Sequence, residues 1–308
     1  MLQHNRIRMQ KTDDFIMLPK IDFAFKLIFG DENNKDILMN FLGKVLRVSV
    51  GEFEALELVN EELAKELMAE QRGSLNVRVR TKEQMELDIV IQVIPHHYKP
   101  ESNLFYWSNK QTKQVEAGSK GGYLKKCITI NVVDFKCIPV NKMHTIFHIF
   151  EDETGHKLTD MLEVHFLELK KIEENRFRDK DDLAKNWAAF LNAQSKKEME
   201  LLANKDNHIR KAYEILQVAS RDEAKRLAYE AREAELMEQR AMYEMRAKIL
   251  KDKVSALNKA REEGINEGIK EGIKEGVYKV ARGLKHEGIQ PEVIQSATGL
   301  TLEEINTL

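Results

Sequence analysis

Two neighbouring segments, residues 74–80 and 86–93, alternate apolar and polar side chains with the period of two that predicts half-buried β-strands. On one shared face the first segment carries Asn76, and the second carries Asp88, Val90 and Gln92. Oxygen-bearing side chains at such positions can hold a divalent cation, which activates water and neutralises charge during phosphodiester hydrolysis. Asn76 and Asp88 are therefore the candidate metal ligands.

Asp88 and Asp22 each have two interpretations. Asp88 lies two residues from Val90, or roughly 7 Å along a strand. It is either a displaced cation ligand or an ordinary polar residue at an exposed strand end, and the second interpretation is favoured. Asp22 shares a face with Lys26, spaced i, i+4, on a short apolar helix predicted to end at Gly30. Asp22 either reaches the candidate site or caps this helix.

Positive charge is concentrated around these segments, although the whole chain of 308 residues has a formal net charge of only -2. Residues 71–126 contain ten basic and five acidic side chains, a local excess of five positive charges. Such a patch fits a polyanion such as DNA. The candidate nucleic-acid-binding residues are Arg78, Arg80, Lys110 and Lys113.

Two other groups suggest chemistry but have simpler explanations. His96 and His97 resemble a transition-metal pair, but adjacent side chains on extended backbone diverge, and a surface loop is favoured. Tyr106 and Trp107 can stack on a base. Near the start of an amphipathic helix, such aromatic residues are more often anchored in the core.

The surrounding segments predict the elements that position these residues. Apolar spacings of three and four predict helices over 33–46 and 104–117. The nearly continuous apolar run 127–134 predicts a central strand buried on both faces. Further strands are predicted over 144–150 and 162–169. Strands on either side of a crossover helix predict a mixed α/β sheet flanked by helices.

Composition predicts the compartment. The two cysteines, Cys127 and Cys137, flank an apolar run and suggest buried free thiols in a reducing environment. No stretch approaches the roughly 18 apolar residues of a membrane span, and the polar start lacks the apolar core of a signal peptide. A cytoplasmic protein without a membrane partner is expected.

After Lys170 the composition favours helix. Apolar spacings over 196–260 predict a long charged helix with a narrow apolar stripe, on the order of 100 Å if single. It must pack on itself, on another chain or back on the domain, and a homo-oligomer is the default expectation. The Glu-Gly-Ile repeat over 263–276 is either a helix with close backbone approach at glycine or a flexible charged linker.

The last thirty residues predict a small helix-turn-helix-like tail. Pro291 opens a helix, Gly288 and Gly299 end helices, and Thr301 with Glu304 forms a capping-box pattern. Acidic residues at the start of the last helix make it a poor DNA reader and favour an assembly role. We therefore divide the chain into a polar lead (1–17), an α/β domain (18–171), a coiled-coil-like helical extension (172–277) and this tail (278–308).

The order and spacing of several stretches resemble one known family. They are Leu18 to Gly30 (LPKIDFAFKLIFG), 75–80 (LNVRVR), 89–92 (IVIQ), 105–108 (FYWS), 124–135 (LKKCITINVVDF) and 162–169 (LEVHFLEL). Together they resemble the recombination-promoting nuclease branch of the PD-(D/E)XK nuclease family transposases, over roughly residues 18–171. The resemblance implies a restriction-endonuclease-like fold and a DNA endonuclease that uses Mg²⁺ or Mn²⁺.

The resemblance also indicates how this chain departs from the family. Members are expected to carry Asp at the position of Asn76, Glu at that of Val90, and Gln in place of the usual Lys at Gln92. The catalytic positions are then Asn76, Asp88, Val90 and Gln92, of which Gln92 keeps the expected residue. We therefore expect a nuclease-family protein that acts on DNA through a degenerate site. The alternative is an inactive DNA-binding or regulatory subunit.

Overall fold

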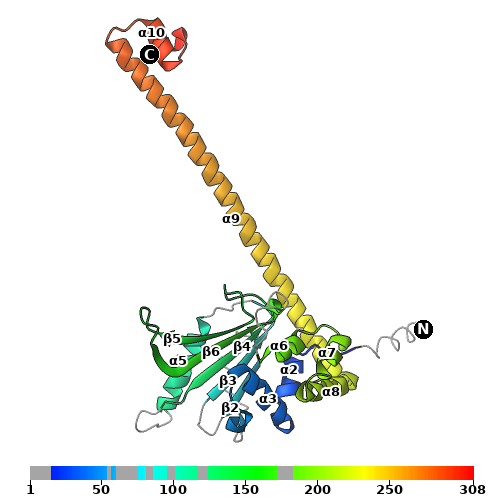
Figure 1. Cartoon of the computed structure of the whole chain (residues 1–308). Helices are drawn as coiled ribbons and strands as arrows, with labels where there is room; N and C mark the ends of the chain where they lie inside the picture. Colours follow the sequence, from blue (N-terminus) through cyan, green and yellow to red (C-terminus); the bar gives the residue numbers. More distant parts are fainter. Residues whose placement is uncertain are drawn as a thin grey trace, which may run out of the picture. The chain divides into compact units, whose positions relative to one another are not determined.

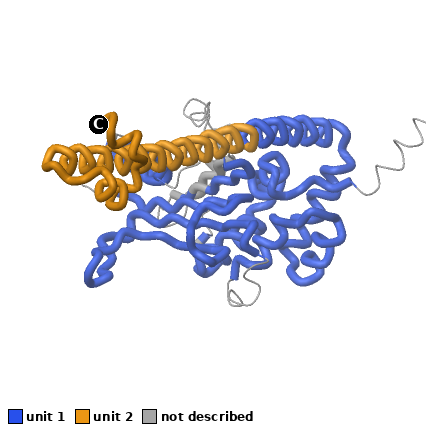
Figure 2. The backbone as a smooth tube through the Cα atoms, turned by 90° about the horizontal axis from the view of Figure 1, so that it is seen from above, with its two compact units in different colours: residues 1–243 blue, residues 244–308 orange. Residues whose placement is uncertain are grey.

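The computed structural model describes residues 15–53, 57–59, 75–80, 86–95, 101–116, 124–172 and 183–308. For some positions in these ranges only the backbone is described, among them Asn76, Arg78, Arg80, Asp88, Lys110 and Lys113. The chain forms two compact units, unit 1 (residues 1–243) and unit 2 (residues 244–308), shown in Figure 2.

Among the described residues, six strands of unit 1 form one mixed sheet. Their order is β1 (Glu57–Val59), β2 (Leu75–Arg80), β3 (Glu86–Gln92), β4 (Cys127–Val133), β6 (Lys157–Glu168) and β5 (His144–Phe150). The β3–β4 and β4–β6 pairs are parallel and the other pairs are antiparallel. Helix α5 (Ser102–Glu116) connects β3 to β4, because a parallel pair requires a crossover. The predicted mixed α/β sheet is confirmed.

Strand β4 lies between β3 and β6, and all seven of its residues are buried. This confirms the prediction, made from its continuous apolar run, of a central strand buried on both faces. Strand β5 has the predicted bounds, whereas β6 begins five residues earlier than predicted, at Lys157. The short β1 was not predicted.

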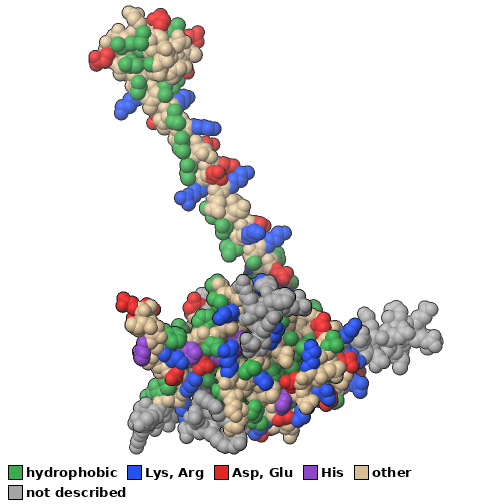
Figure 3. All heavy atoms as spheres, in the orientation of Figure 1, with side chains coloured by type: hydrophobic (Ala, Val, Ile, Leu, Met, Phe, Trp, Pro, Cys, Tyr) green, Lys and Arg blue, Asp and Glu red, His purple; other side chains and the backbone are tan. Residues whose placement is uncertain are grey.

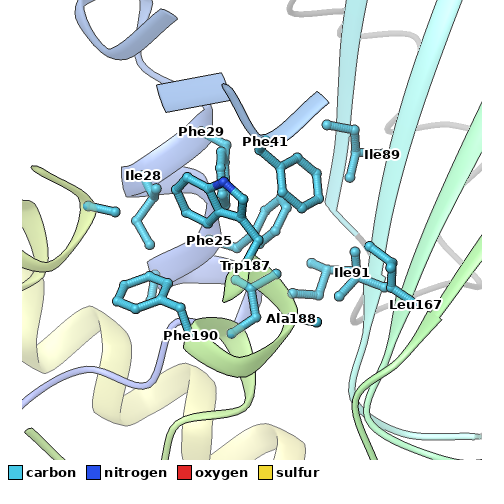
Figure 4. Close-up of a cluster of buried hydrophobic side chains, with 14 of the residues drawn as sticks. Phe25, Ile28, Phe29, Phe41, Ile89, Ile91, Leu167, Trp187, Ala188 and Phe190 are labelled. Carbon is cyan, nitrogen blue, oxygen red and sulfur yellow. The ribbon is translucent and has the colours of Figure 1, made fainter. Parts of the chain in front are cut away.

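One face of the sheet packs against helices from both ends of unit 1. These are α2 (Asp22–Phe29), α3 (Lys35–Leu46), α6 (Lys185–Asn192), α7 (Lys196–Ala203) and α8 (Asn207–Arg221), grouped beside the sheet in Figure 1. Short 3-10 turns, η1 (Glu32–Asn34) and η2 (Val50–Phe53), flank α3, and η3 (Leu169–Lys171) follows β6. Figure 4 shows Trp187 of α6 among Phe25, Phe29 and Phe41, facing Ile89 and Ile91 of β3.

The core of unit 1 continues beyond the sheet. The prediction placed the end of the α/β domain at Lys171, where η3 ends, while the compact unit extends to Tyr243. Helix α9 (Glu223–His286) begins inside this unit, and the hydroxyl of Tyr229 accepts a hydrogen bond of 3.1 Å from the backbone N–H of Leu18. The helical segment after residue 196 is therefore not one rod, because α8 packs on α2 and α3 and α7 packs on α8.

Unit 2 consists of the rest of α9 and two short helices. The Glu-Gly-Ile repeat lies within α9, so it is helical rather than a flexible linker. The tail has the predicted elements: α10 (Pro291–Thr298) begins with proline, Gly288 and Gly299 have positive φ angles of 77° and 75°, and Thr301 and Glu304 form a capping box on α11 (Leu302–Thr307). Ala281, Ile294, Leu300 and Ile305 form its small core.

In the part of the chain that the structure describes, no helix has the length and apolar character needed to span a membrane.

Trp187 gives a direct test of the core between the sheet and the helices. Its side chain is fully buried, and its indole N–H donates a hydrogen bond of 2.9 Å to Oδ1 of Asn40. Trp187→Ala should lower the free energy of unfolding by about 3–5 kcal/mol, because it leaves a large cavity. Urea denaturation followed by circular dichroism measures this change. The exposed Leu201 of α7 is the control, and Leu201→Ala should change stability by less than about 0.5 kcal/mol.

Candidate functional site

The antiparallel pair β2–β3 is the platform for the predicted site. The backbone register places Asn76 opposite Val90 and Arg78 opposite Asp88. On the other side of β3, Asp88 pairs with Thr129 of β4, Val90 with Asn131, and Gln92 with Val133. Paired residues of neighbouring strands lie on the same face of a sheet, so the expected order of positions on the two strands is present.

The described side chains do not fit a divalent cation at this platform. Val90 has no oxygen atom, and Gln92 supplies at most one neutral amide oxygen. Among the described residues, no three His, Cys, Asp or Glu side chains are grouped so that they can hold a metal ion. The side chains of Asn76 and Asp88 lie outside the described set, so their predicted role as ligands remains a prediction.

Helix α5 covers this face of the sheet with amide side chains. Asn131 of β4 donates a hydrogen bond of 3.0 Å to Oδ1 of Asn103, and Gln111 donates to the carbonyl oxygen of Lys125 at 3.2 Å. Trp107 belongs to the same inward face and donates a hydrogen bond of 3.2 Å to the carbonyl oxygen of Met161. Trp107 packs against Ile138, Leu162 and other residues of a second hydrophobic cluster, which supports its interpretation as a core anchor.

A charged cluster lies where β3 and β4 end. We call it the Asp134 cluster, and it consists of Lys20, Asp134, Lys170 and Arg240. The carboxylate of Asp134 is fully buried, 2.9 Å from Nζ of Lys20, 3.2 Å from Nζ of Lys170 and 3.5 Å from Nη2 of Arg240. The backbone N–H of Asp134 donates to the carbonyl oxygen of Gln92 at 3.0 Å, which places this cluster directly beside the predicted site.

A second buried carboxylate holds the segment between β4 and β5. Oε1 of Glu168 accepts hydrogen bonds from the backbone N–H groups of Cys137 and Ile138, and its Oε2 pairs with Lys171. Lys171 in turn donates to the carbonyl oxygens of Ile138 and Val140. Burial and the neighbouring Glu168 carboxylate raise the pKa of Cys137 to about 12, so this thiol is protonated and unsuited to act as a nucleophile.

The other residues predicted from the sequence are Asp22, Lys26, the four basic residues and the two histidines. Arg232 of α9 holds the Asp22 carboxylate in a bidentate ion pair with distances of 2.7–3.0 Å, and Asp22 also accepts from the N–H of Phe23. Lys26 is exposed on α2. The side chains of Arg78, Arg80, Lys110 and Lys113, and all of His96 and His97, lie outside the described set.

Sequence reasoning missed a chain of titratable side chains on β5 and β6. His144 and His165 share a hydrogen bond of 3.0 Å between Nε2 and Nδ1, and Nε2 of His165 lies 2.7 Å from Oε1 of Glu163. Lys126 and His148 pair with the other oxygen of Glu163 at 2.6 and 3.4 Å. The spacing of two between Glu163 and His165, next to a strand with His144 and His148, was the available signal.

Burial alone would raise the pKa of Glu163, but hydrogen bonds from His165 and Lys126 outweigh burial and hold the pKa well below its usual range. A carboxyl group with a lowered folded-state pKa stabilises the fold above its unfolded pKa of about 4.3, and this stabilisation is lost as the pH falls toward the folded-state value. Glu163→Gln should therefore destabilise the protein more at pH 7 than at pH 3.

Urea denaturation at the two pH values measures this difference. Glu238→Gln, an exposed change on α9, is the matched control and should show the same small effect at both. An effect of Glu163→Gln that does not depend on pH would show that the carboxylate charge does not stabilise the fold.

Comparison with known proteins gives one match. No curated protein and no solved structure matches the chain. The family model described as PD-(D/E)XK nuclease family transposase matches residues 19–242, which covers more than two thirds of the chain and includes the sheet, α2 to α8 and the first part of α9. The chain therefore belongs to the PD-(D/E)XK nuclease family transposases.

Proposed function

We propose that this protein acts on DNA, that metal-dependent phosphodiester cleavage promoting recombination is its ancestral chemistry, and that its active site is degenerate. The family match over residues 19–242 carries this proposal. The order of β2, β3, the α5 crossover and the buried β4 supports a restriction-endonuclease-like fold. Cleavage of this kind requires Mg²⁺ or Mn²⁺ held by carboxylates.

Local charge supports DNA as the partner. The excess of five positive charges over residues 71–126 surrounds the β2–β3 platform in the sequence. Arg78 and Arg80 belong to β2, and Lys110 and Lys113 belong to α5, the helix over the same face as Val90 and Gln92. Basic side chains of this kind bind phosphate oxygens of the backbone without reading the base sequence. We propose that these four side chains contact the sugar-phosphate backbone of DNA.

One observation favours a second candidate, an inactive DNA-binding or regulatory subunit of the same family. Val90 lies opposite Asn76 in the register, at the position where the family is expected to supply a glutamate. Neither residue carries a charge, so the proposed attraction of a cation at these positions depends on Asp88. The two candidates differ in whether Asp88 compensates for the lost carboxylates.

Incubation with supercoiled plasmid in Mg²⁺ or Mn²⁺ separates the two candidates. The inactive subunit predicts plasmid binding that weakens as salt rises, with no nicking above the protein-free background. Gel electrophoresis detects nicked and linear products, and a filter-binding assay measures retention. Nicking that Asp88→Ala abolishes would contradict the inactive subunit and identify Asp88 as a working ligand that compensates for the lost carboxylates. Absence of any DNA binding would reject both candidates.

The same plasmid assay tests whether positions 76 and 90 are the metal-ligand positions, if the expected carboxylates are restored there. The double variant Asn76→Asp with Val90→Glu should nick plasmid when Mg²⁺ is added, because two charged ligands then face one another across β2 and β3. The matched control, Asn76→Asp with Val90→Gln, has nearly the same shape with one charge fewer. Equal behaviour of the two variants would show that Val90 does not occupy the position of the missing ligand.

Self-association through the helical extension is a further part of the proposal. Within unit 2, α9 exposes Leu250, Val254 and Leu257, at spacings of four and three that suit a helix–helix interface. Figure 3 shows hydrophobic side chains along this helix between charged ones. A helix with this many exposed apolar side chains gains stability by pairing, so the supported state is a homo-oligomer.

Light scattering coupled to size-exclusion chromatography tests this association. The wild-type protein should have at least twice the mass of one chain, and Leu250→Lys with Leu257→Lys should reduce it to a single chain, because lysine ammonium groups are costly to bury. Lys251→Ala with Lys253→Ala is the control on the same helix. A wild-type mass of one chain at micromolar concentration would argue against the homo-oligomer.

A further inference from the structure

The Asp134 cluster contains more positive charge than its carboxylate can neutralise. Asp134 and Lys20 are both buried, with side-chain exposures of 0% and 9%, and their distance of 2.9 Å makes them a hydrogen-bonded ion pair. This pair alone satisfies the rule that a buried charge needs an opposite partner. Lys170 and Arg240 add two further positive charges to the same carboxylate.

These two additional cations differ from Lys20 because they reach the surface. Their side chains are 49% and 46% exposed, and they lie 3.2 and 3.5 Å from the two oxygens of Asp134. Cations that share one carboxylate repel each other, and a purely structural link would need only one of them. Among the residues that the structure describes around Asp134, the arrangement leaves a local excess of two positive charges at the surface, which suits an anionic partner.

The location connects this charge to the predicted site. Arg240 donates a hydrogen bond of 3.0 Å from Nη2 to the carbonyl oxygen of Val93, the residue after Gln92. Asp134 follows β4, and its N–H bonds to Gln92 itself. Lys170 belongs to η3, directly after β6. The first part of α9, which belongs to unit 1, carries Arg240 to these strand ends. In parallel sheets this carboxyl edge is the usual place for ligands.

We propose that Lys170 and Arg240 bind phosphate oxygens of the DNA backbone and that Asp134 is the positioning residue that holds them beside Gln92. This inference rests on the proposed function, that the protein acts on DNA. A guanidinium offers forked N–H donors that match phosphate oxygens, and the ammonium group of lysine adds a second positive charge. Asp134 fixes both groups before DNA arrives.

The salt dependence of DNA binding tests the two cations. Fluorescence anisotropy with a labelled DNA duplex gives the affinity of the full chain over a range of chloride concentrations. Lys170→Gln and Arg240→Gln should each reduce the slope of log affinity against log salt by about one, and the double variant by about two. Lys211→Gln removes an equally exposed cation that pairs with Asp36 of α3 instead, and should leave the slope unchanged.

Four outcomes of this experiment have distinct meanings. Slopes that fall only for the Lys170 and Arg240 variants support the inference. Equal slopes for these variants and the wild type overturn it and leave DNA binding intact. A wild-type protein that does not bind the duplex overturns the inference together with the proposed function. A slope that falls equally for the Lys211→Gln control would show a general loss of positive charge rather than a binding site, and would also overturn the inference.

The positioning role of Asp134 needs a variant that keeps the net charge. The first variant, Asp134→Asn, leaves Lys20 buried without its partner. The second variant combines Asp134→Asn with Lys20→Met. This double change removes the buried ion pair and leaves the net charge of the protein unchanged. Thermal denaturation identifies which variants remain folded. Severalfold weaker binding by a folded variant supports positioning, because Lys170 and Arg240 are still present. Binding equal to or tighter than that of the wild type overturns it.

Discussion

The burial of β4 on both faces is the constraint on which the rest of unit 1 depends. A strand with seven buried residues must be covered on both sides, and the two covers differ chemically. One is an aromatic core around Trp187, built from helices at both ends of the unit. The other is α5, whose Asn103, Gln111 and Gln114 face the sheet with amides. Amides can satisfy buried polar partners without introducing charge, so α5 covers this face with no additional ion pair.

Buried carboxylates at the strand ends connect the sheet to distant parts of the chain, because they need cationic partners. Asp134 and Glu168 are buried, and each must have partners because an unpaired buried charge is strongly destabilising. Asp134 forms ion pairs with Lys20, which precedes α2, and with Arg240 of α9. Asp22 of α2 likewise forms an ion pair with Arg232 of α9. The first part of α9 is therefore an integral part of unit 1, which agrees with a family model that extends to residue 242.

The sequence predicts those features whose cause is local. Alternation over 75–80 identified β2, a continuous apolar run identified β4, and the pair Thr301 and Glu304 identified the cap of α11. Strand β1 has three residues, which is too short for a period to be visible. The helix boundary at Asp206, which caps α8, was hidden by an apolar stripe that continues across it. In the candidate site, the shared face of Asn76 and Val90 follows from the strand pattern, whereas their pairing comes from the structure. The Asp134 cluster joins residues 36 to 220 positions apart and has no local signature.

In the proposed function, binding and cleavage depend on different parts of this structure, so that one can be lost while the other is kept. The proposed cation ligands belong to β2 and β3, while the charges of the Asp134 cluster come from the segment before α2, η3 and α9. Two carboxylates spaced two residues apart on one strand repel each other unless a cation lies between them. Valine at position 90 removes that repulsion next to Asp88 and adds a β-branched side chain suited to a half-buried strand. In the proposed function, valine in place of the expected glutamate therefore favours the platform without metal and leaves the charges of the Asp134 cluster unchanged.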